Sequence, residues 1–306
     1  MEEKVITAAP ARKKHEGSLK RRRIAGNTAI YIILVIMSFV WLIPFLLILF
    51  QSFNVDWYYL DSTKIGGGMV NYAFPDHWGF NNYINLFKET NFLKWYLNTF
   101  LIALATATVQ TVMILTMAYT LSRLRFKGRK FLMNFMLVLG MFPGFLSMIV
   151  LYYILKDVGL TGEGAIGGLI LVYVASSGMG YYVSKGFFDT VPKSLDEAAR
   201  VDGATRLQVL FKVILPLSKP IIIYTVLTAF MGPWGDFMFA RLIAMGTEGS
   251  YNVALGMQMF LDDTQLGNHY TLFCAGGVVV AIPITILFMI LQRYYVEGVT
   301  GGAVKG

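Results

Sequence analysis

The sequence predicts an all-α integral membrane protein with six membrane-spanning helices, and three observations support this fold class. Of the 306 residues, 56% are hydrophobic and only 14% are charged, whereas soluble domains carry about 25% charged residues. The mean hydropathy is +0.58. The apolar residues gather in long segments, and about 20 apolar residues suffice to cross the hydrocarbon core. Backbone polar groups in lipid must be satisfied within the protein, so helices are the expected form.

The predicted spans follow a basic N-terminal arm at residues 1–27. In chain order they are Thr28–Phe50, Leu97–Leu121, Leu132–Leu155, Ala165–Phe187, Ile221–Met245 and Leu272–Tyr294. The first span lacks a small-residue cleavage site, which favours an uncleaved helix over a signal peptide. The chain is therefore expected to consist of the arm, a first span with an outer loop at 28–96, a transmembrane core at 97–294 and a cytoplasmic tail at 295–306.

The distribution of basic residues predicts the orientation of these spans, because Lys and Arg concentrate in cytoplasmic loops. All but five of the 26 Lys and Arg residues lie in the arm, in the loops after spans two and four with their flanks, and in the tail. The five exceptions are Lys64, Lys88, Lys94, Lys156 and Arg241. Both termini are therefore expected inside the cell. The formal net charge of +8 then fits a topology signal near anionic lipid rather than nucleic-acid binding.

The loop between spans four and five is the longest polar, helix-competent stretch of the apolar part of the chain, Val191–Pro220. Its sequence S-L-D-E at 194–197 fits an S-x-x-E capping box, and T-R-L-Q at 205–208 fits T-x-x-Q. Gly203 is expected to end the first helix, and Pro216 the second. The loop therefore predicts two short helices that meet at a glycine on the cytoplasmic surface of the membrane.

Apolar side chains are expected to give this helix pair a face that a soluble partner can grip. They are Leu195, Val201, Leu207, Val209, Leu210 and Phe211. Such residues in a cytoplasmic loop indicate a docking surface, because the pair lies between two long apolar segments and outside the lipid.

The same loop matches E-A-A-x3-G-x9-I-x-L-P, the signature of ABC-importer permeases. The matching positions are Glu197, Ala198, Ala199, Gly203, Val213, Leu215 and Pro216, with Val213 in place of the family's Ile. The loop thus resembles the coupling helix pair of that family, which docks in a cleft of the ATPase subunit. The resemblance implies ATPase-coupling roles for Leu195, Glu197, Ala198, Ala199, Asp202, Gly203, Leu215 and Pro216.

Other stretches resemble the sugar-type members of that family. They are Phe80–Phe87, Asn98-Thr99, Ala118-Tyr119, Arg123–Arg129 and the span-three kink Met141-Phe142-Pro143. The tail from Gln292 closely resembles the C-terminus of the smaller maltose/maltodextrin permease, whose glycine-rich end inserts between two ATPase subunits. The resemblance implies ATPase contacts by Thr300, Gly301, Gly302, Lys305 and Gly306. A frayed terminus is the alternative interpretation.

Candidates for the solute pathway are Pro143, Trp234 and Asp236. Asp236 and Arg241 are costly against lipid, so both are expected to face protein or water. For Asp236 a structural hydrogen bond and direct solute contact both remain open.

The last outer loop, Gly246–Tyr270, supplies candidates for contact with a binding protein. In maltose-type importers this loop of the smaller permease reaches into the sugar-binding protein, which implies contact by Tyr251, Met257 and Met259. A purely structural loop fits the sequence equally well.

The motifs that the sequence lacks bear on catalysis. It contains no G-x4-G-K-[ST], no H-E-x-x-H and no G-x-S-x-G. The histidines His15, His77 and His269 lack metal-ligand spacing, and the single cysteine, Cys274, is expected to be a small core residue. We therefore predict no catalytic residue, no metal and no cofactor in this chain, with ATP and Mg²⁺ bound by a separate ATPase subunit.

The residues and the resemblance together predict half of the pathway of an ATP-driven ABC importer for a maltodextrin-like oligosaccharide. The implied partners are a second, homologous permease subunit, two ATPase subunits, an extracellular or periplasmic sugar-binding protein and membrane lipid. The expected location is the bacterial cytoplasmic membrane. Alternatives are a permease for a different sugar or polyol and an autonomous carrier, although no internal inverted repeat is obvious.

Overall fold

The computed structural model describes residues 13–55, 74–75, 77–176, 179–261 and 266–303. Helices dominate this part of the chain, and its one β pairing is an isolated bridge between Asn54 and Trp78. The predicted all-α class is therefore confirmed.

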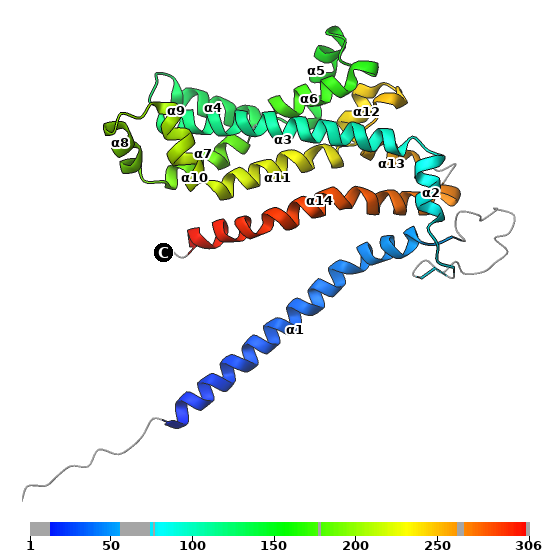
Figure 1. Cartoon of the computed structure of the whole chain (residues 1–306), viewed down its shortest axis with the longest axis horizontal. Coiled ribbons are helices and arrows are strands. Elements are labelled where there is room, and N and C mark those ends of the chain that lie inside the picture. The colour runs from blue at the N-terminus through cyan, green and yellow to red at the C-terminus, as the bar shows by residue number, and fades with distance from the viewer. Residues whose placement is uncertain (1–12, 56–73, 76, 177–178, 262–265, 304–306) are drawn as a thin grey trace, which may run out of the picture.

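The helices take up almost the whole of the described chain (Figure 1). In order they are α1 (Lys13–Ser52), α2 (Asn81–Lys88), α3 (Phe92–Arg123), α4 (Arg129–Gly140), α5 (Gly144–Asp157), η2 (Gly162–Gly164), α6 (Ala165–Ala175), α7 (Gly180–Thr190), α8 (Lys193–Val201), α9 (Arg206–Val209), the π-helix η3 (Leu210–Ile214), α10 (Leu215–Leu217), α11 (Lys219–Gly235), α12 (Met238–Ala244), η4 (Glu248–Ser250), α13 (Val253–Met259) and α14 (Leu266–Ala303).

Four helical stretches of the described chain are long and apolar enough to cross a membrane. They are Gly26–Ser52, Phe92–Arg123, His269–Gln292 and Gly162–Thr190, the last with residues 177 and 178 outside the described part of the chain. Two bent pairs raise the number to six if each counts as one span: α4 with α5, bent by 98°, and Arg206–Leu217 with α11, bent by 86°. The chain is thus a multi-pass membrane protein.

The expected kink in the third span is a complete break. α4 ends at Gly140, and α5 begins at Gly144 directly after Pro143. Pro143 has φ −58° and ψ 122°, an extended conformation that suits the residue before a helix. The proline therefore starts a new helix and does not merely bend an existing one.

One predicted span end is wrong. The fifth span was expected to reach Met245, but α11 ends at Gly235, after Pro233 in its last turn. Asp236 is extended there, and its Oδ1 accepts a hydrogen bond from the backbone N–H of Phe239 at 3.1 Å, which starts α12. The sixth span was predicted over Leu272–Tyr294, and the matching apolar stretch of α14 is His269–Gln292, within three residues at either end, while the helix itself continues to Ala303.

α3 is the central helix of the bundle. It packs against α6, α7, α11 and α13, while α14 packs between α11 and α1. In Figure 1 α3 and α11 run side by side, and α1 meets α14 at one end and diverges from it toward the other. Much of α1 is therefore left exposed.

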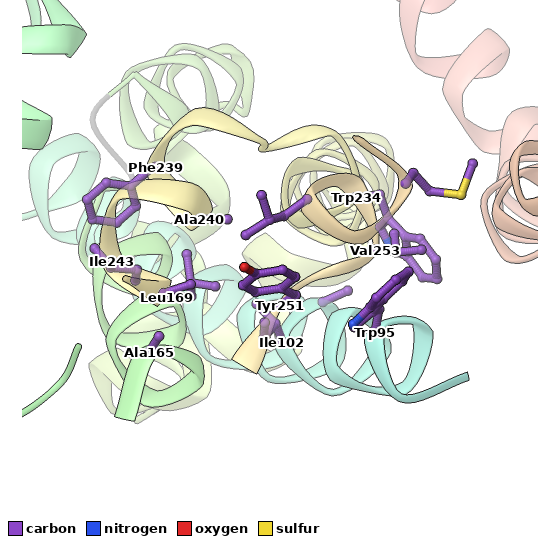
Figure 2. Close-up of a cluster of buried hydrophobic side chains, with 14 of the residues drawn as sticks. Trp95, Ile102, Ala165, Leu169, Trp234, Phe239, Ala240, Ile243, Tyr251 and Val253 are labelled. Carbon is purple, nitrogen blue, oxygen red and sulfur yellow. The ribbon is translucent and has the colours of Figure 1, made fainter. Parts of the chain in front are cut away.

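The main core lies near one end of α3 (Figure 2). Trp95 and Ile102 of α3 meet Leu169 of α6, Trp234 of α11 and Ile243 of α12 there. A second, smaller cluster lies around Tyr119 near the other end of α3. α3 thus connects two cores through the length of the molecule.

The two ends of the bundle carry different elements. Figure 1 places the start of α1, the α8–α10 region and the end of α14 at one end, and α2, α12 and α13 toward the other. We call these the inner and the outer end. This arrangement agrees with the predicted order of loops, while the assignment of the inner end to the cytoplasm stays a prediction.

Candidate coupling site

The first helix of the loop between spans four and five starts differently from the prediction. α8 begins at Lys193, with Pro192 in the N-cap position, and has no side-chain cap. The predicted capping box with Ser194 as N-cap and Glu197 at N3 is therefore wrong. Proline fixes its own φ near the helical value, so the helix starts directly after Pro192. Ser194 then lies inside the helix and cannot occupy the N-cap position.

The end of α8 is formed at Gly203, as predicted. Gly203 has φ +83°, a left-handed conformation that favours glycine. The N–H of Gly203 donates to the carbonyl of Arg200 at 3.1 Å, and the N–H of Ala204 donates to that of Ala199 at 2.9 Å. This pair of bonds is a Schellman motif, which satisfies carbonyls at the end of the helix.

The second predicted capping box is present. The N–H of Gln208 donates to Thr205 Oγ1 at 3.3 Å, and the N–H of Thr205 donates to Gln208 Oε1 at 2.8 Å. α9 then passes into η3 and α10, so Pro216 lies inside α10 and the turn follows at Ser218. The helical stretch Arg206–Leu217 therefore ends one residue after Pro216, so the prediction that Pro216 stops the second helix is confirmed to within one residue.

Polar side chains at the inner end of α3 hold both flanks of this helix pair. Tyr119 Oη donates to the carbonyl of Arg206 at 3.0 Å, and Ser122 Oγ donates to Asp189 Oδ1 at 2.6 Å. Arg123 Nη2 donates to the carbonyls of Phe188 and Val191, each at 2.8 Å. α3 is thus tied to the end of α7 and to the start of α9.

Arg123 also reaches α8 through an ion pair. Its Nε lies 3.1 Å from Asp196 Oδ2, and the two side chains are 4% and 14% exposed. Within the described chain Arg123 Nη1 and Asp196 Oδ1 are buried without a hydrogen-bond partner. Burial raises the pKa of Asp196, and the attraction of Arg123 offsets that effect only in part. The ion pair is short, but each of its two side chains keeps a polar atom without a hydrogen-bond partner.

Four apolar side chains are exposed on the helix pair, among exposed charged ones such as Glu197 and Asp202. Leu195 is 41% exposed, Val201 87%, Leu207 66% and Phe211 62%. We call these four residues the coupling face. The other two members of the predicted apolar set, Val209 and Leu210, are instead buried in the inner core.

The remaining coupling candidates mostly lie at this surface. Glu197, Ala198, Asp202, Gly203 and Pro216 are exposed, whereas Ala199 and Leu215 are partly buried against the inner core. The fold therefore gathers the candidates at one end of the bundle, and their roles toward an ATPase stay predictions.

The candidates in the last outer loop have different surroundings. Tyr251 and Met257 are buried in the outer core, and Met259 is exposed. Asn98 Nδ2 donates to the carbonyls of Gly249 and Tyr251, at 3.1 and 2.9 Å. The N–H of Val253 donates to Thr99 Oγ1 at 2.6 Å. α3 thus fixes the segment 249–253.

The pathway candidates lie in three separate environments. Asp236 accepts a hydrogen bond from the Tyr173 hydroxyl, and its backbone carbonyl accepts one from Asn252 Nδ2 at 2.6 Å. Trp234 is buried against Tyr96, whereas Pro143 is exposed. The structure gives Asp236 a structural hydrogen-bond role.

The candidates in the tail lie at the end of α14. Thr300, Gly301 and Gly302 belong to the helix, and Lys305 and Gly306 lie outside the described residues. Among the described residues no group of three or more His, Cys, Asp or Glu side chains could hold a metal ion.

Sequence reasoning missed the clamp formed by Tyr119, Ser122, Arg123 and Asp196. The available signal was the spacing of three polar side chains on an otherwise apolar span. Residues at i, i+3 and i+4 lie on one face of a helix, which holds for Tyr119, Ser122 and Arg123.

Comparisons with known proteins identify the family of the chain and several relatives. Residues 110–301 match the family described as "Binding-protein-dependent transport system inner membrane component". The chain is 34% identical to the galactooligosaccharides transport system permease protein GanQ of Bacillus subtilis (strain 168), over 94% of this chain and 99% of GanQ. It is 32% identical to the maltodextrin transport system permease protein MdxG of the same organism, over 93% and 98%.

A third relative and a solved structure extend the comparison. The maltose/maltodextrin transport system permease protein MalG of Yersinia pestis is 37% identical over 70% of this chain and 71% of MalG. A chain from the crystal structure of a bacterial ABC transporter involved in the import of the acidic polysaccharide alginate superposes with a TM-score of 0.72 at 23% identity, covering 94% of this chain and 100% of that one. The latter shows a shared fold.

Proposed function

The chain belongs to the family of binding-protein-dependent transport system inner membrane components, and on that premise we propose that it is a permease subunit of an ATP-driven importer of oligosaccharides. The chain forms half of the transport pathway and carries out no bond chemistry. The cytoplasmic membrane of a bacterium is its site of action. A second, homologous permease subunit supplies the other half.

The main observation in support of this proposal is the coupling face, whose backbone is held by local hydrogen bonds. Four apolar side chains point away from the core at the turn between α8 and α9, where water alone would be an unfavourable neighbour. The Schellman motif at Gly203 and the capping box at Thr205 fix the backbone beneath them. A preformed apolar face of this kind suits docking into the cleft of a soluble subunit.

The soluble subunit in this proposal is an ATPase, present in two copies and binding ATP and Mg²⁺. The chain has no phosphate-binding loop of its own. Closure of the ATPases moves α8 and α9, and the clamp at Arg123 passes this movement to α3. Because α3 also holds the outer segment 249–253, inner and outer ends move as one body.

An extracytoplasmic sugar-binding protein delivers the solute at the outer end. The names of GanQ, MdxG and MalG favour an oligosaccharide related to galactooligosaccharides or maltodextrins. A different sugar or polyol is the alternative. Uptake of labelled maltodextrin in competition with galactooligosaccharide, maltose and a polyol separates these substrates.

The test of the proposal changes the coupling face and leaves the bundle intact. Val201→Asp places a charge on the most exposed residue of this face, and Glu197→Lys reverses a charge beside it. We expect ATP-driven uptake in reconstituted vesicles to fall at least about tenfold for either variant, since burying an unpaired charge in an interface costs more than about 1.4 kcal/mol.

Val158→Asp is the matched control, because it makes the same change at an exposed valine after α5. It should retain uptake within about twofold, as expected of surface substitutions. Membrane insertion and thermal stability should be equal for all three variants. Normal uptake by Val201→Asp, or uptake by this chain reconstituted without an ATPase, would refute the proposal.

A further inference from the structure

A cavity of about 410 Å³ lies between the inner end of α3, the loop that follows it and the α8–α9 pair. We call it the basic pocket. Its cationic lining residues are Arg123, Arg125, Arg129, Lys193, Arg200 and Arg206. Only two acidic side chains, Asp196 and Glu197, line it as well. The lining is therefore strongly cationic.

These cations are largely unpaired within the described chain. Arg123 pairs with Asp196, and the other five cationic side chains form no ion pair with a described residue. Six cationic side chains against two acidic ones leave an excess of positive charge, and like charges repel one another. The pocket is therefore electrostatically incomplete, and an anion would relieve the repulsion.

A second cavity of about 650 Å³ adjoins the basic pocket and shares Arg125 and Arg129 with it. Phe126, Phe131 and Met133 give this second cavity an apolar lining. Phe131 is 74% exposed. Its ring stacks on that of Phe135 with centroids 5.9 Å apart and an angle of 11°. We call this cavity the apolar pocket.

The two pockets share Arg129, the first residue of α4, which with α5 forms a bent pair apolar enough to cross a membrane. α3 has 32 residues and so is about 48 Å long at 1.5 Å per residue, which exceeds the hydrocarbon thickness of about 30 Å. Arg129 opens α4, and exposed Phe131 and Phe135 follow in its first two turns. Basic and aromatic side chains in this order are typical of the membrane–water interface.

We propose that the two pockets together bind one anionic phospholipid, with its phosphate between Arg125 and Arg129 and an acyl chain along Phe126 and Phe131. Guanidinium groups bind phosphate oxygens with paired N–H donors, and basic pockets on the cytoplasmic side of membrane helices suit anionic headgroups. Placement in the cytoplasmic leaflet rests on the proposed function, which orients the inner end toward the cytoplasm.

The apolar pocket is the reason for a lipid in place of a soluble phosphate compound. A small phosphate ester would satisfy the basic pocket alone and leave Phe126 and Phe131 uncovered. A phospholipid has a phosphodiester beside an apolar chain, just as the cationic basic pocket lies beside the apolar pocket. Because Lys193 and Arg200 of α8 line the basic pocket, the headgroup also connects α8 to the α3–α4 loop.

The test measures lipid retention by the full chain in nanodiscs that contain equal amounts of phosphatidylglycerol and phosphatidylcholine. Native mass spectrometry after release gives the affinity for each lipid. We expect wild type to retain phosphatidylglycerol selectively, and Arg125→Gln with Arg129→Gln to weaken that binding about tenfold, as expected from the loss of charged hydrogen bonds. Lys127→Gln with Lys212→Gln removes the same charge outside both pockets and should bind within about twofold of wild type.

Phe131→Ser distinguishes the two sources of phosphate. Lipid retention should fall in this variant, whereas binding of inorganic phosphate, measured by calorimetry in detergent, should be weak and unchanged. Equal retention of both lipids by wild type, or equal losses in the two double variants, would overturn the proposal. Tight inorganic phosphate binding that is insensitive to Phe131→Ser would replace the lipid with a soluble anion. Neither readout depends on transport, so failure here leaves the proposed function intact, and failure of uptake leaves the lipid site intact.

Discussion

Each end of α3 holds neighbouring segments in place, but the two ends do so with different kinds of interaction. At the outer end, Asn98 and Thr99 hold the segment 249–253 through neutral hydrogen bonds. At the inner end, Arg123 holds α7 and α8 through an ionised side chain. The outer end leaves unpaired only neutral polar groups among its described side chains, the indoles of Trp95 and Trp234, whereas the inner end leaves ionised atoms unpaired.

The burial of apolar side chains also differs between the two ends. Tyr251 and Val253 at the outer end are buried in a large core (Figure 2). Val201 and Phe211 at the inner end face away from the bundle. The outer end is therefore a closed core, whereas the inner end leaves apolar side chains exposed. The proposed function would account for this difference, because in that proposal an ATPase docks at the inner end while hydrogen bonds hold the outer end together.

The largest effect is expected from replacing Arg123, a change that should affect the inner end alone. Arg123→Ala leaves Asp196 buried without its partner and frees the carbonyls of Phe188 and Val191. Breaking a buried ion pair from one side costs about 3–5 kcal/mol. We expect the α7–α8 region to open locally, with faster amide exchange at 188–206 and unchanged exchange at 249–253.

Arg123→Lys is the control for charge in that experiment. Lysine keeps the charge but cannot donate to two carbonyls and a carboxylate in the fixed geometry of a guanidinium. It should lie between wild type and Arg123→Ala. Uniform changes in amide exchange at both ends of α3 would show that the two ends are not separate.

The next effect is expected at the outer end. Asn98→Ala removes the donor that serves the carbonyls of Gly249 and Tyr251. An unsatisfied buried group costs about 1–3 kcal/mol. The apparent melting temperature in detergent should fall, while the ratio of transported solute to hydrolysed ATP stays at the wild-type value.

A change in that ratio for Asn98→Ala would mean that the Asn98 hydrogen bonds are themselves needed for coupling, and that the remaining bond from the Val253 N–H to Thr99 does not suffice. Arg123→Ala provides the contrast, because the proposed function predicts a lower ratio for that variant. The two substitutions therefore test whether stability and coupling reside at different ends of α3.

Much of this arrangement could be predicted from the sequence, because a chain that crosses lipid must form long apolar helices. Runs of apolar residues located four helices able to cross a membrane, or six if each bent pair counts as one span, and Gly203 located the end of α8, since few residues other than glycine adopt positive φ easily. The Thr205 capping box was equally local and was confirmed. These features depend on neighbours within a few residues.

The errors arose where distant residues decide the local structure. The fifth span looked continuous to Met245, but a turn at Asp236 is held by Tyr173 and Asn252 from other elements. For Tyr251 and Met257 the sequence left partner contact and a structural loop equally open, and the burial of both residues depends on Asn98 and Thr99, which bind the segment between 249 and 253. Hydropathy within one segment contains no information about such partners.

A smaller effect concerns the two capping boxes, of which only one is formed. Thr205→Ala removes the bond from the Gln208 N–H, and loss of an N-cap costs about 1 kcal/mol. Ser194→Ala removes no cap, because Ser194 lies within α8. We expect a lower melting temperature for Thr205→Ala only, and a modest loss of uptake because α9 positions Leu207 and Phe211. Equal effects of the two substitutions would mean that Ser194 also caps its helix.

The smallest expected effect is a pH dependence at Asp196. Burial raises the pKa of this carboxyl group above its ordinary value of 3.8. In the interval between the unfolded-state and folded-state pKa values, the folded chain binds more protons than the unfolded chain. The free energy of unfolding therefore decreases as pH rises through this interval and is constant above it. Asp196→Asn should remove this part of the slope when melting temperatures in detergent are compared from pH 4 upward at fixed salt. Identical slopes for wild type and variant would show that Arg123 compensates fully for burial, so that the inner end would be as well satisfied electrostatically as the outer end.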